Sequence, residues 1–328
     1  MTRRPMPPPL QMPKPGLWRR TPPAIFPPIM GLFGLGLGWR AAAPAYGITP
    51  AIGDLILGAV ALLFLFALVA WLAKPLRRAS VVIEELQVLP GRAGLAAASL
   101  SLMLLAASLA PLAPDLALGV ALLAFAVHLA LAGLVIHVLR AGPPEGRTVT
   151  PVFHLTFVGF IIGGVAANAL GYPDLARLLV WAMLIPAGLI WGISARQMVS
   201  RLPPAPLRPL LAIHLAPASL FVIVAHGAGM VNAAHGFMAL AVAILVALLA
   251  SARWLTAGGF SPLWGAFTFP LAAVAQAMIL ISQGQGVIGL IGGALLLAAT
   301  LIVPIITYRV IKLWASGTLA AKTNAAEA

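Results

Sequence analysis

The sequence contains no cysteine and very little charge. Among its 328 residues there is no Cys, and only 8% are Asp, Glu, Lys or Arg. The absence of Cys excludes disulfides, iron–sulfur clusters, thiolate metal sites and Cys nucleophiles. The scarcity of charge excludes a water-soluble globular domain of this size, because 62% of the residues are hydrophobic and the mean hydropathy is +1.05. The composition therefore predicts a membrane protein.

Apolar runs with the length of a membrane crossing fill most of the chain. A helical crossing needs about 20 apolar residues, so there is room for about ten of them and little for a catalytic domain outside the membrane. Very short gaps follow the first, third, fifth, seventh and ninth spans, which predicts tight antiparallel hairpins. The expected fold is an all-α membrane protein of ten transmembrane helices in five helical hairpins. The spans are expected at residues 24–43, 49–73, 93–111, 115–139, 151–170, 173–195, 211–231, 234–256, 263–283 and 286–308.

These spans divide the chain into three parts. A Pro-rich basic tail at residues 1–22 precedes the ten-helix domain at 23–308, and a C-terminal tail follows at 309–328. The N-terminal tail has the composition of an extended or disordered segment. The same region has a second interpretation, a cleaved signal peptide, since TRRP, an apolar stretch and RAAAPAYG occur in that order. A retained span is favoured, because Pro27 and Pro28 break the apolar stretch and Arg40 follows it.

Charge is distributed unequally between the two ends of the expected spans. The net charge is +13. Every Lys and Arg except Arg40 and Arg177 lies in one of the tails or in a loop that follows the second, fourth, sixth or eighth span. Asp54, Asp115 and Asp174 lie at the opposite end. Cationic residues remain on the cytoplasmic side of short loops, so both termini are expected in the cytoplasm and the chain in a bacterial inner membrane. The positive charge then reports topology and attraction to anionic lipid, and no nucleic-acid partner is expected.

Pro residues concentrate in the odd-numbered spans. Pro27 lies in the first, Pro151 begins the fifth, Pro217 lies in the seventh and Pro270 in the ninth, whereas the second, fourth and eighth have no interior Pro. The sixth and tenth contain Pro186 and Pro304, so the contrast is a tendency and not a rule. A Pro inside a membrane helix frees a backbone carbonyl, which is tolerated where protein or a water-filled cavity satisfies it. The odd spans are therefore the better candidates to line a path, although Gly and Pro also occur where membrane helices pack closely.

The middle of the expected spans contains no Asp, Glu or Lys, so a proton pump or a cation site lacks its usual carboxylates. Six histidines occur, and imidazole is a common ligand of haem and copper. A packing role is favoured, because there is no HExxH and no pair at i, i+4, so no metal or cofactor is expected. His154 and His214 are the two of interest, since both lie on odd spans close to the cytoplasmic side. The histidines are His128, His137, His154, His214, His226 and His235.

Four segments resemble one known family. PPAIFPPIMGLFGLGLGWRAA, which begins at Pro22, resembles the first helix of the tellurite-resistance and dicarboxylate transporter family, to which the bacterial tellurite-resistance protein A and the plant slow anion channels belong. ANALGYPDLARLLVWA at 167–182 is similar to that family's fifth-to-sixth turn, LAIHLAPASLF at 211–221 to its seventh helix and LWGAFTFPLAA at 263–273 to its ninth. The resemblance extends from about residue 20 to residue 312.

The resemblance implies five hairpins around a central pore, with odd helices inside and even helices outside, and a homotrimer with one pore per subunit. It implies that Phe269 closes the pore and that Pro217 is the kinking proline of the seventh helix. Three positions depart from the family pattern: Pro27 and Pro270 replace glycines, and Thr156 replaces a proline. The other candidate pore-lining residues are Phe26, Phe153, His154, His214 and Phe267.

The leading hypothesis is an anion channel, or an anion-permeable transporter, without a cofactor or covalent chemistry. A bulky ring in a narrow apolar constriction closes a pore by steric exclusion and dewetting. The expected partners are membrane lipid and small inorganic or carboxylate anions. Two alternatives stay open: a carrier for dicarboxylate, sulfite or tellurite-type oxyanions, and a haem or copper redox protein. The sequence leaves channel and carrier undistinguished, because they differ in a conformational equilibrium.

Overall fold

The computed structural model describes residues 16–328, which form helices and loops without a β-strand. Most of the tail expected at 1–22 lies outside the described residues. The α-helices are α1 (Phe26–Tyr46), α2 (Ala51–Arg77), α3 (Val81–Gln87), α4 (Leu89–Leu109), α5 (Pro114–Ala141), α6 (Phe160–Ala169), α7 (Pro173–Ser200), α8 (Leu215–Gly227), α9 (Val231–Ala250), α10 (Ala252–Leu255), α11 (Gly265–Ser282), α12 (Gly286–Ala315) and α13 (Thr318–Lys322). Short 3-10 helices are η1 (Pro23–Ile25), η2 (Pro144–Arg147), η4 (Ala205–His214) and η5 (Pro262–Trp264), and η3 (His154–Val158) is a π-helix.

Eight helical segments of the described chain are long and apolar enough to cross a membrane. They are α2, α4, α5, α7, η4 with α8, α9, η5 with α11, and α12. The chain is therefore an all-α membrane protein, as its composition predicts. Two of the ten expected spans are not among the eight: α1, which is rich in Gly and Pro, and the shorter apolar helix His154–Ala169.

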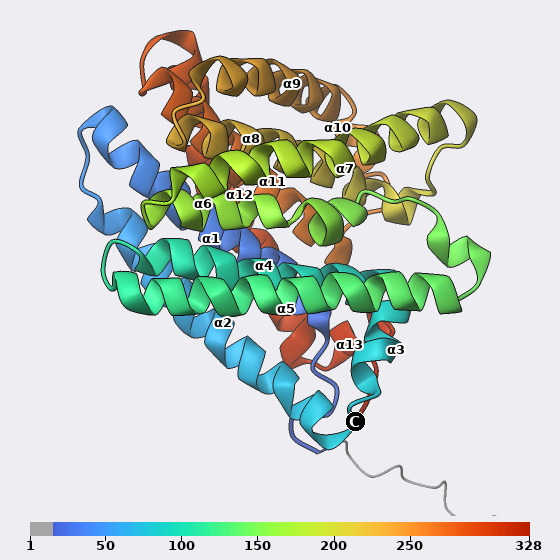
Figure 1. Ribbon diagram of the computed structural model, residues 1–328. Helices are drawn as coiled ribbons and strands as arrows, with labels where there is room; N and C mark the ends of the chain where they lie inside the picture. The colour runs from blue at the N-terminus through green and yellow to red at the C-terminus, as the bar shows by residue number, and fades with distance from the viewer. Residues whose placement is uncertain (1–15) are drawn as a thin grey trace, which may run out of the picture.

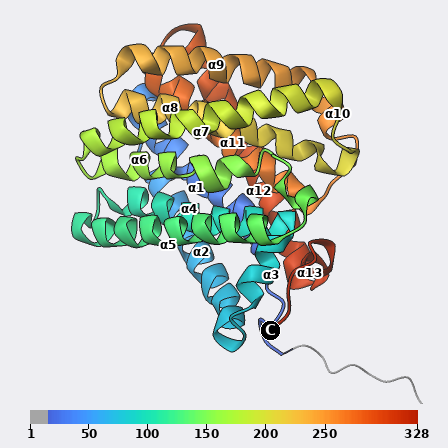
Figure 2. The same cartoon turned by 45° about the vertical axis from the view of Figure 1, so that its right-hand side comes forward.

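Helices that follow one another in the chain lie side by side. α1 packs against α2, α4 against α5, α6 against α7, α8 against α9, and α11 against α12. Figures 1 and 2 show α4 beside α5, and α8 beside α9, as rods that run along each other. A short helix, α3, separates the pair of α1 and α2 from the pair of α4 and α5.

One helix of each pair lies inside the molecule. α1 contacts α4 and α11, α4 contacts α6, α6 contacts α8, and α8 contacts α11, so these five helices form a closed circuit. In α4, 89% of the most apolar stretch of the helix is buried, whereas in its partner α5 only 33% of that stretch is buried. The partners α2, α5, α7, α9 and α12 expose large Leu, Ile and Val side chains, which suits contact with lipid.

Glycines let α1 and α11 approach closely. A Cβ atom on Gly31 would lie 2.3 Å from both Cβ and Oγ1 of Thr268, a separation that two such atoms do not tolerate. A Cβ atom on Gly34 would lie 3.0 Å from Cδ2 of Phe269. Small residues at helical spacing are the usual means of close helix packing in membranes. In this chain they place the ring of Phe269 directly against the backbone of α1.

The end of α2 differs from the expected boundary. The apolar run predicts that the second span ends at residue 73, but α2 continues to Arg77 and contacts α3 and α4. Lys74, expected in a loop, is consequently a fully buried helix residue. Its ammonium group pairs with the carboxylate of Glu85 on α3 and donates a hydrogen bond to the carbonyl of Thr21 at 3.0 Å.

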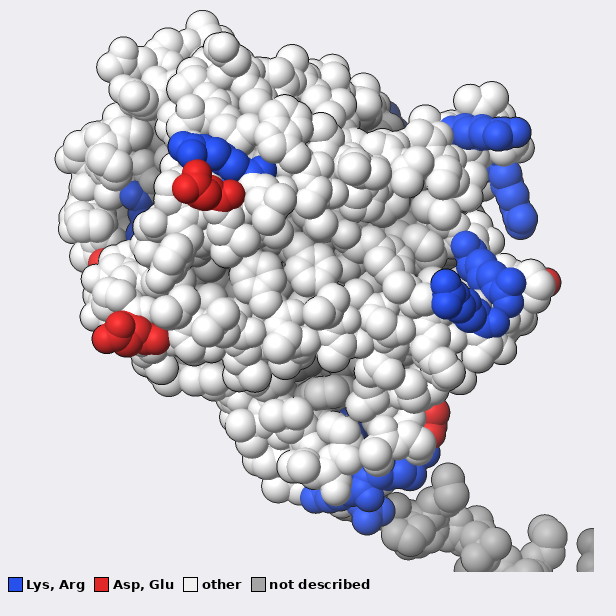
Figure 3. All heavy atoms as spheres, viewed as in Figure 1, with Lys and Arg blue, Asp and Glu red and all other residues white. Residues whose placement is uncertain are grey.

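Charged side chains gather at the ends of the helices. On the face shown in Figure 3, most Lys and Arg side chains cluster at one end and along the lower edge, and acidic side chains also lie at the opposite end. The C-terminal segment is held at the basic end: Arg20 Nε lies 3.0 Å from Glu327 Oε2, and the Ala328 N–H donates to the Arg19 carbonyl at 3.1 Å.

Candidate functional site

The five inner helices, together with the short helices η1, η3, η4 and η5 that lead into four of them, are called the inner segments. They surround a cavity at the end of the molecule where each segment begins. Its empty volume is about 560 Å³, including the open mouth. We name it the vestibule. None of its lining side chains is polar. The lining residues are Ala24, Pro27 and Met30 from η1 and α1; Pro90, Ala93 and Ala97 from α4; Leu155 from η3; Leu210, Ile213 and Ala216 from η4 and α8; and Pro262, Leu263, Gly265, Ala266, Phe269 and Pro270 from η5 and α11.

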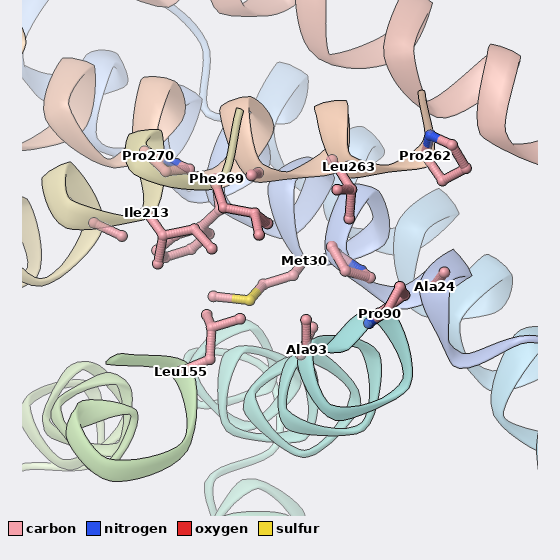
Figure 4. Close-up of a pocket in the computed structure, with 16 residues that line it drawn as sticks. Ala24, Met30, Pro90, Ala93, Leu155, Ile213, Pro262, Leu263, Phe269 and Pro270 are labelled. Carbon is pink, nitrogen blue, oxygen red and sulfur yellow. The ribbon is translucent and has the colours of Figure 1, made fainter. Parts of the chain in front are cut away.

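A second cavity lies further along the inner helices, with an empty volume of about 250 Å³ that includes adjoining open space. We name it the inner cavity. It shares Met30, Leu155, Ile213 and Ala216 with the vestibule, so these four residues form the boundary between the two spaces. Figure 4 shows the Met30 side chain extending between Leu155 and Ile213. The remaining lining comes from α4, η3, α6 and α8, namely Leu100, His154, Val158, Gly159, Ile161, Ile162, Pro217 and Leu220.

Phe269 lies on the wall of the vestibule. α11 positions it one residue before Pro270, which supplies no N–H to the helix and so leaves the Ala266 carbonyl without its usual donor. The ring is 5% exposed and packs against Gly34 of α1. In Figure 4 it points toward the same space as Met30 and Ile213. A large ring and a flexible thioether therefore both line the vestibule.

Three of the eight expected site residues line the axial cavities: Phe269 faces the vestibule, and His154 and Pro217 face the inner cavity. The other five lie elsewhere among the described residues. Phe26 packs edge-on against Phe64 of α2 at a ring separation of 6.1 Å. Phe153 packs against Phe157, and Phe267 against Trp264, at ring separations of 5.4 Å and 5.7 Å respectively.

Thr156 and His214 are the remaining two. Thr156 is buried within the π-helix η3, and its hydroxyl has no hydrogen-bond partner. His214 ends η4 and lines a third space between α7, η4 and α9, which we name the lateral cavity. Its empty volume is about 920 Å³, including the open mouth. It does not line the vestibule or the inner cavity.

His154 and His214 are brought together although 60 residues separate them in the sequence. His154 Nε2 lies 3.0 Å from His214 Nδ1, so one imidazole donates a hydrogen bond to the other. The backbone carbonyl of His214 accepts a hydrogen bond from Trp191 Nε1 on α7 at 3.2 Å. A single π-turn inserts an extra residue into a helix and is frequent at functional sites. Here the π-helix η3 carries His154 at its first position.

Met30, Leu155 and Ile213 are lining residues that sequence reasoning missed. A resemblance to a family identifies positions with a distinctive residue, such as a Pro or a Phe, and common aliphatic residues carry no such mark. One signal was present: Pro27, Pro90 and Pro262 each lie in the first turns of an inner segment and line the vestibule. Pro is favoured in the first turn of a helix, where its missing N–H costs nothing.

The electrostatic character of the vestibule comes from the backbone. All five inner segments reach it through their N-terminal ends, where the helix dipole is positive. At the far end of the molecule, two arginines contact the C-terminal ends of inner helices. Arg40 donates to the Ser108 carbonyl at 2.8 Å and pairs with Asp54, and Arg177 donates to the Ala228 carbonyl at 3.0 Å.

Within residues 16–328, no three His, Asp or Glu side chains gather as a metal-ligand set. Among those described residues, no Asp, Glu or further His joins the His154–His214 pair to form a set of three metal ligands. His128 is buried separately, with Nδ1 at 2.8 Å from the Ser99 hydroxyl.

Comparison with known proteins identifies one family. The family model described as "Voltage-dependent anion channel" matches residues 20–311. No curated protein matches the chain.

Proposed function

Because the chain belongs to the voltage-dependent anion channel family, which includes tellurite-resistance proteins and plant slow anion channels, we propose that it conducts small anions across a membrane through the vestibule and the inner cavity. The observation that carries this proposal is the position of the vestibule, at the meeting point of five helix N-termini. The positive ends of the helix dipoles favour an anion there. An apolar wall offers a cation no ligand in exchange for its hydration shell.

Phe269 is the proposed gate. Its ring lies on the vestibule wall, and the Met30 side chain lies at the boundary with the inner cavity. An apolar constriction at this point excludes water and hydrated ions. Opening then requires the ring to leave its place against Gly34. Selectivity follows from pore width and positive potential, and no step forms or breaks a covalent bond.

The proposed architecture extends the eight membrane-crossing segments to ten, by adding α1 and the helix that η3 and α6 form together. Each inner helix and its outer neighbour is then one hairpin, and five hairpins surround the pore. The basic end of the molecule lies in the cytoplasm, with both termini, and the chain resides in a bacterial inner membrane as a homotrimer. Contacts within each pair of helices and the closed circuit of inner helices support the ring of five hairpins.

The test is anion flux in proteoliposomes. Phe269→Ala removes the ring, so we expect the chloride flux to rise at least about tenfold, which corresponds to ~1.4 kcal/mol of barrier. Phe267→Ala is the matched control, because Phe267 lies on the same helix but packs against Trp264 outside the cavities. Equal flux in the two variants and the unaltered protein would remove Phe269 from its proposed role. Absence of anion flux from all three would contradict the proposed function itself.

A panel of anions separates the channel from the carrier. Chloride, nitrate, sulfite and malate are compared at equal gradients. A channel gives flux that rises in proportion to the gradient, whereas a dicarboxylate or oxyanion carrier gives saturable flux for its own substrate. Tellurite belongs in the same panel, because resistance of cells to tellurite would not identify it as the transported ion.

A further inference from the structure

The axial path contains one polar side chain. Among the described residues that line the vestibule and the inner cavity, all are aliphatic, aromatic, Gly, Pro or Met except His154. An anion that enters so apolar a space loses hydrogen bonds to water and gains few in return. A hydrogen-bond donor at this point therefore has a large effect on which anions enter.

His154 is equipped to be that donor. The residue is 3% exposed, and it lines the inner cavity. Its Nε2 atom is engaged with His214, and its Nδ1 atom has no hydrogen-bond partner. A buried imidazole nitrogen without a partner is costly, and such groups in native proteins call for an explanation. An anion in the inner cavity would supply the missing partner.

The hydrogen bond to His214 is linked to the nitrogen of His154 that carries the proton. When His214 Nδ1–H donates to His154 Nε2, the single proton of neutral His154 is on Nδ1, as an N–H donor. The opposite arrangement leaves Nδ1 as a bare acceptor, which repels an anion. An anion in the cavity thus favours the first arrangement, and the hydrogen bond between the rings couples the two tautomers.

The surroundings contain no charge that would compete for the anion. Neither the inner cavity nor the lateral cavity is lined by Asp, Glu, Lys or Arg. On α5, which packs against η3, His128 is occupied by Ser99, and on η4 itself Arg208 lies over the Trp254 ring at 4.4 Å.

We propose that His154 is the anion-binding residue of the inner cavity: it binds a small monovalent anion through Nδ1–H, and His214 is the positioning residue that keeps the proton on that nitrogen. The ligand class is an anion that accepts strong hydrogen bonds, such as chloride or nitrate. This inference rests on the proposed function, because it assumes that anions reach the cavity.

The experiment compares two anions within each variant, so that the amount of folded protein cancels. Chloride accepts strong hydrogen bonds, and thiocyanate is weakly hydrated and depends less on a donor. His154→Leu removes the donor, and we expect its chloride-to-thiocyanate flux ratio to fall about tenfold, the usual effect of losing a hydrogen bond to a charged group. His154→Asn retains an N–H donor and should keep the ratio close to that of the unaltered protein.

The control is His235→Leu on α9, since His235 is exposed and bonds to the Val231 carbonyl of its own helix. An unchanged ratio in His154→Leu, with flux present, would overturn this inference and leave the proposed function standing. No flux of either anion in the unaltered protein would overturn both.

The role of His214 is tested by spectroscopy. In protein labelled with ¹⁵N-histidine and reconstituted in lipid with chloride, the ¹⁵N shifts of His154 should report a proton on Nδ1. In His214→Leu that proton should redistribute to Nε2, and the flux ratio should fall, whereas His214→Asn, which retains a side-chain donor, should restore both. A His154 tautomer that is the same in His214→Leu would remove the positioning role.

Discussion

Among the described residues, the buried ion pair between Lys74 and Glu85 is the charge interaction with the largest expected effect on the stability of the fold. Both side chains are fully buried, and one oxygen of Glu85 has no hydrogen-bond partner. Taking two charges out of water is expensive, and mutual attraction offsets that cost only while both partners are present. Removal of one partner should therefore be far more harmful than removal of both.

We expect Lys74→Met to lower the free energy of unfolding by about 3–5 kcal/mol. Lys74→Met combined with Glu85→Met should recover most of this loss, because no unpaired charge remains. Arg78→Met breaks the exposed pair with Glu84 and should have a much smaller effect. Denaturation of the purified protein measures all three. Equal losses in the single and double variants would show that the pair itself, and not the isolated charge, stabilises the fold.

The loss in Lys74→Met should also depend on pH. Burial raises the pKa of the Glu85 carboxyl, and the positive charge of Lys74 is the main opposing influence. Without Lys74 the pKa is higher still, so the folded state binds a proton that the unfolded chain releases above about pH 4.3. A carboxyl whose pKa is higher in the folded state stabilises that state at a pH below its pKa in the unfolded chain. This contribution to the free energy of unfolding is lost as the pH rises through the folded-state pKa. The free energy of unfolding of Lys74→Met should therefore be closest to that of the unaltered protein at about pH 4.

Which face of a helix a residue occupies was the least predictable property at this scale. Phe26 and Phe269 both lie on inner helices, and the sequence marks both as aromatic residues near a proline. The helix rotation sets one against Phe64 of α2 and the other against the vestibule. That rotation results from packing across the whole ring of helices, which no local pattern contains.

At the scale of elements, hydropathy predicts the helices well because the membrane requires a continuous apolar run for each crossing. Every expected span overlaps a helix of the structure. The pattern does not predict α3, the break that separates α10 from α9 within the expected span 234–256, or the π-helix η3. α3 and α10 are short and depend on neighbours for stability, and a π-turn is one extra residue that leaves the composition unchanged.

The contact between α1 and α11 gives a prediction about elements. A Cβ atom on Gly31 would overlap Thr268, so Gly31→Ala should force the two helices apart and lower the free energy of unfolding by about 1–3 kcal/mol. Gly58→Ala on α2 is the matched control, because a Cβ atom there meets no atom within 4 Å. In that variant the usual helix preference of Ala over Gly should add about 0.5–1 kcal/mol. If Gly31→Ala were as stable as Gly58→Ala, the close packing of α1 on α11 would be refuted.

At the scale of the whole molecule, the placement of charge and the placement of the vestibule describe one axis. Among the residues that the structure describes, the N-terminal ends of the inner helices, the vestibule mouth and most Lys and Arg lie toward the same end. In the proposed topology this end faces the cytoplasm, where cationic loops are retained. Its positive charge would then raise the local concentration of anions at the mouth of the proposed path.

This orientation has a direct test, because the chain contains no Cys and any introduced thiol is the only one. Glu145→Cys places a thiol on the exposed loop after α5, at the basic end, and Gln285→Cys places one on the exposed loop between α11 and α12, at the other end. With a membrane-impermeant maleimide, Gln285→Cys should react in intact spheroplasts and Glu145→Cys only in inverted vesicles. The reverse pattern would place the vestibule outside the cell. The ten-helix arrangement puts five spans between α5 and α12, so the two thiols should lie on opposite sides of the membrane. Reaction of both thiols from one side would contradict that arrangement.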